Sequence, residues 1–369
     1  MRKMKHCGLL FLLISLIIGG CGAKENPETT DPSEEQKQIV VGFSQVGAES
    51  DWRSANTESM KSTFTEEKGY QLIFEDAQQK QTNQITAIRT FIQRDVDYIV
   101  LAPVTETGWE TVLTEARDAG IPVIIVDRMV DVTDEDLFTC WVGSDFELEG
   151  KKVAKWLEAY AQSKGIDPEM IRIADLQGTL GATAQIGRTE GLKSVAEENG
   201  WSIVACEPAD FTQAMGKEVM ESLLKRKVDI NVVYCENDNE AFGVIEALEK
   251  AGKKIGSDLA AGEIMVLSFD GVKEQALEDV LDNKISCIAE CNPLHGPRVE
   301  AIIETLESGR TPEKREYVDE ELFTALPEIT TISVGGQYYS VNILNREKVD
   351  DRAALFDSGS YTDQSENVY

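Results

Sequence analysis

The chain has 369 residues, of which 42% are hydrophobic and 28% charged, as is ordinary for a soluble globular protein, and its length suggests two domains. Its net charge is −30, with 66 acidic residues against 36 Lys and Arg. Because nucleic acids and anionic membranes attract basic surfaces, this charge argues against either of them as the main partner.

The first 21 residues have the features of an export signal. Basic residues stand at positions 2, 3 and 5, and residues 8–20 are apolar but shorter than the roughly 20 residues that span a bilayer. The segment ends in Ile18-Gly19-Gly20-Cys21, which is similar to a bacterial lipobox and predicts lipidation of Cys21. Two or more acyl chains on that cysteine would anchor the protein stably to a membrane.

A polar segment follows the signal. Residues 22–38 contain two prolines, two threonines, several acids and almost no apolar side chain. This composition predicts a flexible tether between the anchor and a folded body.

From residue 39 onward, short apolar runs alternate with helical patterns. The runs predict buried strands at 39–44, 70–74, 97–102, 121–126 and 138–142. Between them, Ile85, Ile88, Phe91 and Ile92 lie on one face of a helix, and residues 112–116 repeat this pattern more weakly. Strands without polar alternation, separated by helices, favour a parallel sheet covered on both faces.

The same alternation starts again after a long helical pattern that begins near Phe146. Strands are predicted at 171–176, 201–206, 230–235, 264–269 and 285–289, and helices at 182–199, 214–227, 238–251, 272–282 and 293–308. Two series of similar length and order predict two doubly wound α/β lobes with parallel sheets. Residues 325–369 give no clear assignment.

The cysteines favour no metal site. Beyond Cys7 and Cys21 there are five, namely Cys140, Cys206, Cys235, Cys287 and Cys291. None has a CxxC spacing, and an odd number cannot all pair within one chain. Four of the five lie in apolar runs, where a buried thiol behaves as a small hydrophobic group. Their oxidation state stays open.

The loop after the first strand carries Glu49, Ser50, Asp51, Trp52 and Arg53. In a parallel α/β sheet, ligands bind at the carboxyl ends of the strands. An aromatic face beside charged hydrogen-bonding groups suits a sugar, which has an apolar C–H face and a rim of hydroxyls. A solvated turn with one buried aromatic is the alternative reading of this loop.

Further polar residues follow other predicted strands. Asp127, Arg128, Asn237, Asp270 and Glu290 each stand at or just after the end of an apolar run. Arg188 lies in the helix after Gly178–Gly181, and Phe211 follows Asp210 in a loop after a strand. Any one of them could be a helix cap or a turn residue. Their recurrence at the same position in both lobes favours one shared cleft.

Several kinds of chemistry lack their sequence signals. After the signal segment the chain has one histidine, His295, so it cannot build a Ser–His–Asp or Cys–His centre or a multi-histidine metal site. Neither a GxGxxG after the first strand nor a GxxxxGK[ST] motif occurs, and we expect no cofactor and no metal. With 66 acids, a glycosidase that uses paired carboxylates stays open, although no pair stands out.

From about Ile39 to about Thr324, the chain resembles the type I (ribose-type) periplasmic sugar-binding proteins of ABC transporters, and within them the galactofuranose binders. The resemblance is carried by VGFSQVGAESDWR (41–53), DAQQKQTNQI (76–85), APVTETGWE (102–110), IPVIIVDR (121–128), LQGTLGATAQIGR (176–188), DFTQAMGKEVMES (210–222) and NDN (237–239). It implies two lobes joined by three hinge crossings, near 139–145, 290–292 and 320–325. The implied lobes are residues 39–142 plus 292–322 and residues 143–291 plus 323–369.

The resemblance also implies a set of ligand-binding residues. They are Ser44, Trp52, Arg53, Asp127, Arg128, Arg188, Phe211, Asn237, Asp270 and Glu290. Trp52 and Phe211 would lie on opposite faces of the sugar, and the charged groups would bind its hydroxyls. The Trp52–Arg53 pair is the feature most similar to the furanose binders. Two features depart from the family: segment 320–369, and Glu290, where many relatives have glutamine.

The expected function is therefore a lipid-anchored, extracytoplasmic, monomeric sugar-binding protein that presents a monosaccharide, galactofuranose or a similar furanose, to an ABC permease, without catalysis. A sugar sensor for a membrane signalling partner would use the same cleft and stays open, as does, less favoured, an extracellular glycosidase. Related transcriptional repressors need a DNA-binding segment where this chain has its lipobox and tether, which argues against that reading and against nucleic acid as a partner.

Overall fold

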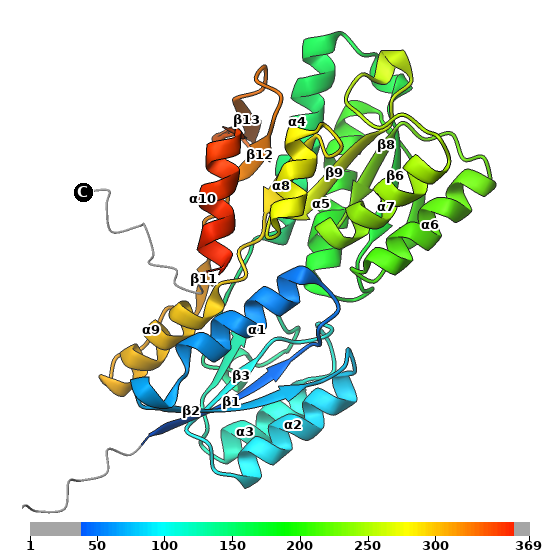
Figure 1. Ribbon diagram of the computed structural model, residues 1–369. Coiled ribbons are helices and arrows are strands. Elements are labelled where there is room, and N and C mark those ends of the chain that lie inside the picture. Colours follow the sequence, from blue (N-terminus) through cyan, green and yellow to red (C-terminus); the bar gives the residue numbers. More distant parts are fainter. Residues whose placement is uncertain (1–37, 358–369) are drawn as a thin grey trace, which may run out of the picture. The chain divides into compact units, whose positions relative to one another are not determined.

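The computed structural model describes residues 38–357 (Figure 1). The predicted signal, Cys21 and nearly all of the predicted tether lie outside the described residues. Between residues 38 and 357, no helix has both the length and the apolar character to cross a membrane.

The first lobe is built on a sheet of six parallel strands in the order β2-β1-β3-β4-β5-β11. The strands are β1 (Ile39–Gln45), β2 (Tyr70–Asp76), β3 (Tyr98–Leu101), β4 (Val123–Val126), β5 (Cys140–Gly143) and β11 (Arg315–Tyr317). Its helices are α1 (Asp51–Thr63), α2 (Gln81–Gln93), α3 (Glu110–Asp118) and α9 (His295–Glu307). One apolar cluster joins α1 and α9 to one face of the sheet, and a second joins α2 and α3 to the other.

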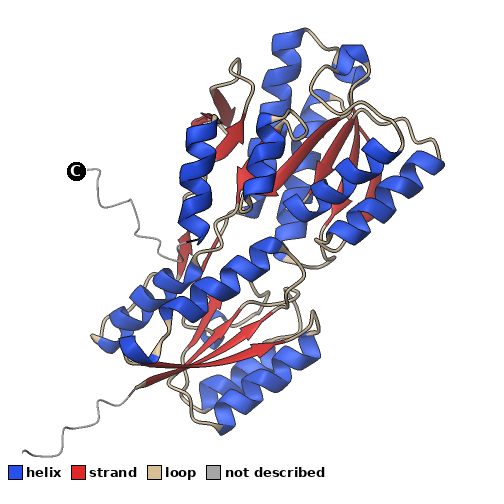
Figure 2. Ribbon diagram, viewed as in Figure 1, coloured by secondary structure: helices blue, strands red, loops and turns tan. Residues whose placement is uncertain are grey.

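The second lobe has a sheet of seven strands in the order β7-β6-β8-β9-β10-β12-β15, in which only β10 and β12 pair antiparallel. The strands are β6 (Arg172–Gln177), β7 (Ser202–Pro208), β8 (Val232–Cys235), β9 (Met265–Asp270), β10 (Cys287–Glu290), β12 (Leu322–Thr324) and β15 (Asn342–Ile343). Its helices are α4 (Phe146–Lys164), α5 (Thr183–Asn199), α6 (Gln213–Lys225), α7 (Asp238–Lys250), α8 (Glu274–Leu281) and α10 (Arg346–Asp357). Helices α4 and α5 cover one face, and α6, α7 and α8 the other (Figure 2).

The apolar runs form strands because they can be buried on both sides. In β4, Ile124 and Val126 pack into one apolar cluster of the first lobe, while Val123 and Ile125 pack into the other. This alternation is the period-2 geometry of a strand, and it explains why a fully apolar run suits a sheet with helices on both faces. The predicted fold class, two doubly wound lobes with parallel sheets, is confirmed.

Both sheets share one strand order. Read from their first strands, β2-β1-β3-β4-β5 and β7-β6-β8-β9-β10 follow the same 2-1-3-4-5 arrangement. In such a sheet the order reverses beside the first strand, and the loops after the strands open a crevice at that point. Each lobe therefore brings the carboxyl ends of its strands to one edge, and this is where the predicted site residues lie.

The chain passes between the two sheets three times. The first passage lies between β5 and α4, the second between β10 and α9, and the third between β11 and β12. The third passage thus falls between Tyr317 and Leu322. The lobe boundaries at 142/143, 291/292 and 322/323 stay a prediction.

The part of the chain left unassigned by the sequence has a definite structure up to residue 357. It forms β12, an antiparallel hairpin, β15 and α10; the hairpin strands are β13 (Thr331–Val334) and β14 (Gln337–Ser340). Four short 3-10 helices complete the described elements: Glu66–Lys68, Glu135–Leu137, Pro168–Met170 and Leu259–Ala261.

All five cysteines in the described part of the chain are unpaired thiols. Four of them, Cys140, Cys235, Cys287 and Cys291, are buried, and Cys206 is exposed. The buried four are the ones that fill gaps among apolar side chains, as expected for small hydrophobic groups.

Asp175, in β6, makes the stability of the fold depend on pH. The residue is fully buried, and burial raises its pKa to about 7, although Lys193 and Cys206 oppose the shift. An unfolded aspartate has a pKa of about 3.9, so stability from protonated Asp175 is fully present below about pH 4 and is lost as pH rises through about 7. The whole change amounts to as much as roughly 4 kcal/mol.

We expect Asp175→Asn, which is neutral at every pH, to unfold at higher urea concentration than the unmodified protein above about pH 7, and to lack this part of the pH dependence. Urea unfolding at about pH 5 and about pH 8 measures the effect. Asp118→Asn is the control, because the Asp118 side chain is 70% exposed and should change neither curve. An unchanged pH dependence in Asp175→Asn would contradict the assignment.

Candidate functional site

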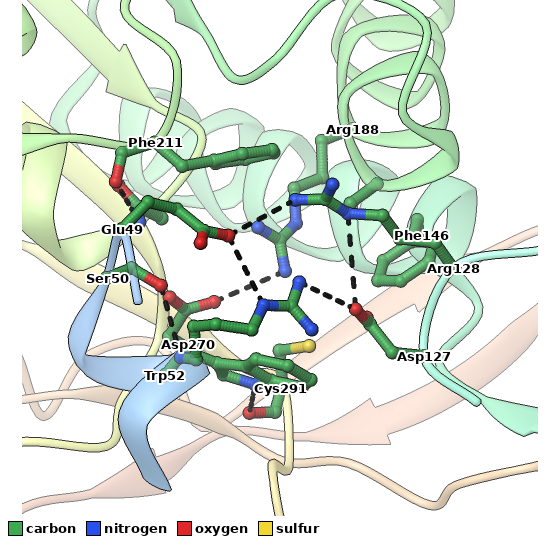
Figure 3. A pocket seen from close by; sticks show the side chains of 13 residues that line it. Glu49, Ser50, Trp52, Asp127, Arg128, Phe146, Arg188, Phe211, Asp270 and Cys291 are labelled. Carbon is green, nitrogen blue, oxygen red and sulfur yellow. Dashed lines mark hydrogen bonds and ion pairs between the residues drawn. The ribbon is translucent and has the colours of Figure 1, made fainter. Parts of the chain in front are cut away.

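A small cavity lies among side chains from both lobes, at the carboxyl ends of the strands (Figure 3). Eight of the ten predicted ligand-binding residues line it: Trp52, Arg53, Asp127, Arg128, Arg188, Phe211, Asn237 and Asp270. The structure therefore brings together residues that are up to 218 positions apart in the sequence, since Trp52 and Asp270 both belong to the set.

The start of α1 positions two of these side chains. Ser50 caps the helix, and its hydroxyl accepts a hydrogen bond from the backbone N–H of Arg53 at 3.1 Å. Such a cap fixes the first helical turn. Trp52 and Arg53 stand in that turn, and the Trp52 indole donates to the carbonyl of Cys291, in the second passage, at 2.8 Å.

Arg53 is the centre of the charges contributed by the first lobe. It is only 3% exposed, and its guanidinium lies 2.9 Å from Asp127 and 3.2 Å from Glu49. It also donates to the side-chain oxygen of Gln45 at 3.1 Å. Burial alone would lower the pKa of Arg53, but the two carboxylates outweigh burial and raise it. Arg53 is thus a permanent cation with fixed geometry.

Arg128, beside Asp127, is less well compensated. Its nearest carboxylates, Glu49 and Asp127, lie 3.9 and 4.0 Å away, and one of its N–H groups donates to Val104 O at 2.9 Å. Burial, together with the nearby Arg53, lowers its pKa to about 10. Within the part of the chain that the structure describes, its buried Nε has no hydrogen-bond partner. Arg128 therefore has a donor to spare for a ligand.

Arg188, on α5, supplies the cation of the second lobe. Its Nε lies 2.8 Å from Glu149, its Nη2 lies 3.4 Å from Asp270, and it also donates to the carbonyl of Glu236. Although burial opposes it, the pKa of Arg188 is raised well above its usual value because Glu149 and Asp270 are close. Burial raises the pKa of Asp270, and Arg188 opposes that shift.

Aromatic rings lie on either side of the charged groups. Trp52 and Phe211 lie on opposite sides of the charged side chains in Figure 3, and Phe146 lies beside Asp127. All three belong to one buried apolar cluster at the junction of the lobes. The site thus offers aromatic faces and, between them, hydrogen-bonding groups of both signs.

Three residues of the site have backbone conformations that side chains rarely adopt. The φ angles are 63° at Asp127, 60° at Phe211 and 93° at Asp270. Phe211 is held in place because its N–H donates to Glu240 at 2.8 Å and its carbonyl accepts from Asn237 at 3.0 Å. Backbone strain that the surroundings maintain is typical of functional sites, above all for a bulky residue such as Phe.

This arrangement suits a small neutral molecule with many hydroxyls. The three guanidiniums lie within 4.0 Å of the four carboxylates of Glu49, Asp127, Glu149 and Asp270, so a ligand need not bring a negative charge. The cavity volume is about 30 Å³, whereas small-molecule pockets usually measure about 300–1,000 Å³. A ligand of sugar size can therefore enter only if the side chains or the lobes move.

Two predicted residues lie elsewhere. The Ser44 hydroxyl is buried in β1 without a hydrogen-bond partner among the described residues, and it does not line the cavity. Successive strand residues face opposite sides, so Gln45, the next residue, is the one that reaches Arg53. Glu290 also lies outside the lining, because its carboxylate pairs with Arg352 of α10 at 2.6 Å.

Five lining residues were not in the predicted set: Glu49, Ser50, Phe146, Ala184 and Cys291. Glu49 stands four residues before Arg53, and this spacing between opposite charges is a usable signal. Ser50 belongs to the loop that the sequence singled out. Phe146, Ala184 and Cys291 have no comparable signal, since an apolar residue in an apolar run is most often part of the core.

One group of described residues has the spacing of metal-binding side chains. Potential metal-ligand atoms of Glu149, Cys291 and Glu320 lie within 4.8 Å of one another, and Cys291 also lines the cavity. Arg188 already lies 2.8 Å from Glu149, and Lys152 donates to the Glu320 carbonyl at 2.9 Å. Because these cations already supply positive charge, we assign no metal to the group.

Several known proteins are similar to this chain. Residues 41–310 match the family model described as periplasmic binding protein domain. The galactofuranose-binding protein YtfQ of Escherichia coli (strain K12) is 40% identical over 281 residues, which are 75% of this chain and 85% of the relative.

Two solved structures of similar proteins contain a bound furanose. One, from Mycobacterium smegmatis in complex with β-D-fucofuranose, is 41% identical with a TM-score of 0.72, over 78% of this chain and 91% of the other. The second is the periplasmic binding protein component of the arabinose ABC transporter from Shewanella sp. ANA-3, bound to α- and β-L-arabinofuranose. It is 36% identical with a TM-score of 0.73, over 89% of this chain and 99% of the other.

Gly178, in the glycine-bearing loop after β6, leaves room for Phe211. A methyl group at Gly178 would come within 1.9 Å of the Phe211 ring, while the Gly178 backbone is not in the left-handed region. We therefore expect Gly178→Ala to displace Phe211 and to lower the free energy of unfolding by about 1–3 kcal/mol through overpacking. Urea unfolding and a crystal structure would measure both effects.

Leu180→Ala in the same loop is the matched control, since Leu180 is 55% exposed and should change stability little. A Gly178→Ala variant with unchanged stability and an unmoved ring would show that the loop yields without affecting the site.

Proposed function

Because this chain belongs to the family of periplasmic binding protein domains, we propose that it is the extracytoplasmic sugar-binding protein of an ABC importer. We propose further that it binds one furanose between its lobes, with galactofuranose as the first candidate. The observation that carries the proposal is the layer of buried charged groups between Trp52 and Phe211 (Figure 3).

Each part of the site then has a role. Trp52 and Phe211 would pack against the two apolar faces of the sugar ring. Arg53, Arg128 and Arg188 would donate to its hydroxyl oxygens, and Asp127 and Asp270 would accept from its hydroxyl groups. Asn237 would act mainly by holding Phe211, to whose carbonyl it donates at 3.0 Å. Charged partners strengthen such hydrogen bonds and discriminate between epimers.

The choice of a furanose rests on the relatives. The three proteins described above are named for, or solved with, galactofuranose, fucofuranose and arabinofuranose, and they match at 36–41% identity. The Trp52–Arg53 pair supports the same choice, as the sequence comparison suggested. Because a sugar-binding role requires no reaction, we propose that the sugar leaves chemically unchanged.

Hinge motion would admit and enclose the sugar. The three passages between the sheets would bend, and the direct contacts between the lobes would break and re-form. These contacts include Asp51 with Lys273 at 2.9 Å, the Asp51 N–H with Asn239 at 2.9 Å and the Glu106 N–H with Gly181 O at 3.0 Å. A sugar that touches both lobes stabilises the closed form.

We also propose a membrane anchor and a membrane partner for the protein. The lipobox predicts that acyl chains on Cys21 hold the protein at the outer face of the cell membrane, with residues 22–38 as the tether. A monomer in this position would deliver the closed form to a membrane permease.

A ligand screen tests the proposal first. We expect galactose, arabinose or fucose preparations rich in furanose forms to raise the thermal midpoint of the protein from residue 39 onward, because binding to the native state stabilises it. Calorimetry would confirm binding, and chromatography should recover the sugar unaltered. A flat screen over monosaccharides would contradict the proposed ligand class, and conversion of the sugar would indicate an enzyme.

Removing a charged partner should weaken binding without abolishing the fold. We expect Asp127→Asn and Arg53→Ala to lower sugar affinity by roughly ten- to a hundred-fold, as the loss of one charged hydrogen bond implies. Calorimetry measures affinity, and circular dichroism checks the fold. Arg89→Ala removes an exposed ion pair with Glu115 and serves as the control. Affinity equal to that of the control would place the binding site elsewhere.

The anchor has its own test. In the full chain expressed in bacteria, labelled palmitate should be incorporated and the protein should sediment with membranes, whereas Cys21→Ser should lose the label and appear in the soluble fraction. Labelling that persists in Cys21→Ser would refute the predicted anchor.

A further inference from the structure

A series of contacts runs from Arg188, which lines the cavity, to the passages between the lobes. Arg188 touches Asp270 of the cavity with Nη2 at 3.4 Å and Glu149 with Nε at 2.8 Å. Glu149 stands in the first turn of α4, directly after the first passage, and its side chain is 2% exposed. Glu149 itself is not a lining residue. Its link to the cavity is therefore its contact with Arg188.

Glu320 lies at the other end of this line. It belongs to the third passage, and its Oε1 accepts from the Ser144 hydroxyl, in the first passage, at 2.7 Å. The same oxygen accepts from the backbone N–H of Asn292, in the second passage, at 2.7 Å. One buried carboxyl group thus connects all three passages between the lobes.

The two carboxyl groups face each other. A carboxyl oxygen of Glu149 and one of Glu320 lie within 4.8 Å of each other, and Glu320 is 8% exposed. Glu149 uses Oε2 for Arg188, and among the described residues its buried Oε1 has no hydrogen-bond partner. Glu320 uses Oε1 for Ser144 and Asn292. A proton on Glu320 Oε2 would donate to Glu149 Oε1, whereas two charged carboxylates would repel each other in a site of low dielectric.

The surrounding charges fit one proton on the pair. The groups that face it are Lys152 on α4, Arg188 on α5, Tyr234 on β8, Asp270 and Glu290 at the ends of β9 and β10, and Cys291. Burial and then the charge of Glu149 raise the pKa of Glu320 well above its usual range. Burial also raises the pKa of Glu149, against the opposing effect of Arg188. Because Glu149 pairs with Arg188 and Glu320 does not, the arrangement favours a proton on Glu320 and a charge on Glu149.

We propose that Glu149 and Glu320 share one proton and act as positioning residues, which hold Arg188 for the sugar and tie it to the three hinge passages. This inference rests on the proposed sugar-binding function. Loss of the proton would place two negative charges side by side at the hinge and loosen the hold on Arg188. Sugar affinity should therefore fall as pH rises through the titration of the pair, by at most about tenfold per pH unit.

Glu320→Gln is the most informative variant, because a glutamine amide imitates the protonated acid but cannot titrate. Its oxygen can still accept from Ser144 and Asn292, and its NH₂ donates permanently to Glu149 Oε1. We expect this variant to bind sugar about as tightly as the unmodified protein at low pH, and to keep that affinity up to about pH 9. Glu320→Ala should lose affinity by roughly tenfold or more at every pH, because the link to Glu149 is gone.

The experiment measures sugar affinity by calorimetry from about pH 5 to about pH 9 for each protein. Glu147→Gln is the matched control: this residue is also on α4, its side chain is 55% exposed, and the variant should keep the pH profile of the unmodified protein. Infrared spectroscopy provides a reading that needs no sugar. A protonated carboxyl band at neutral pH should be present in the unmodified protein and Glu147→Gln, and weaker in Glu320→Gln.

The outcomes separate the two proposals. An unmodified protein that binds no sugar refutes the proposed function, while the infrared band still decides whether the pair holds a proton. Sugar binding with the same pH profile in Glu320→Gln and the unmodified protein overturns the positioning role. An unchanged band in Glu320→Gln, or one equivalent of a divalent metal in the purified protein, overturns the shared proton.

Discussion

The rest of the site depends on the burial of three guanidinium groups. Arg53, Arg128 and Arg188 are each 2–3% exposed, and an isolated charge in such surroundings would cost many kcal/mol. Their partners come from the same lobe in every case. Glu49 and Asp127 serve Arg53 and Arg128 in the first lobe, whereas Glu149 and Asp270 serve Arg188 in the second.

This pairing within lobes has a mechanical consequence. If an arginine of one lobe relied on a carboxylate of the other, separating the lobes would leave charges without partners, at a cost of several kcal/mol. Here the described contacts between the lobes include hydrogen bonds, apolar packing around Trp52 and Phe211, and the partly exposed pair of Asp51 and Lys273. The Arg128 guanidinium also lies over the Phe211 ring, 5.2 Å from its centroid, without depending on a carboxylate of the other lobe. Exposed pairs contribute little. The lobes can therefore separate while each keeps its charges matched.

The sequence predicts the fold, and it also indicates most of the residues that line the cavity, because both follow from local patterns. Apolar runs form the strands, and the parallel order then brings the residues after each strand to one edge. This is why Asp127, Arg128 and Asp270 line the same cavity. Local patterns fail where a partner is distant. Glu290 forms an ion pair with Arg352, which lies in a C-terminal helix that the sequence did not indicate. The contact of Glu149 with Glu320 joins residues that are 171 positions apart. Ser44 is buried in β1 and does not line the cavity, whereas Gln45, which faces the other side of the strand, contacts Arg53.

The two sides of the cavity are connected to the hinge in different ways. On the first lobe, Trp52 is connected directly, because its indole donates to the Cys291 carbonyl in the second passage. On the second lobe, Arg188 is connected through Glu149 to Glu320, which touches the first and second passages. A ligand that packs on Trp52 and binds Arg188 therefore acts on the hinge from both lobes at once. Only the second connection passes through an acid pair, so only that side of the hinge can respond to pH through a shared proton.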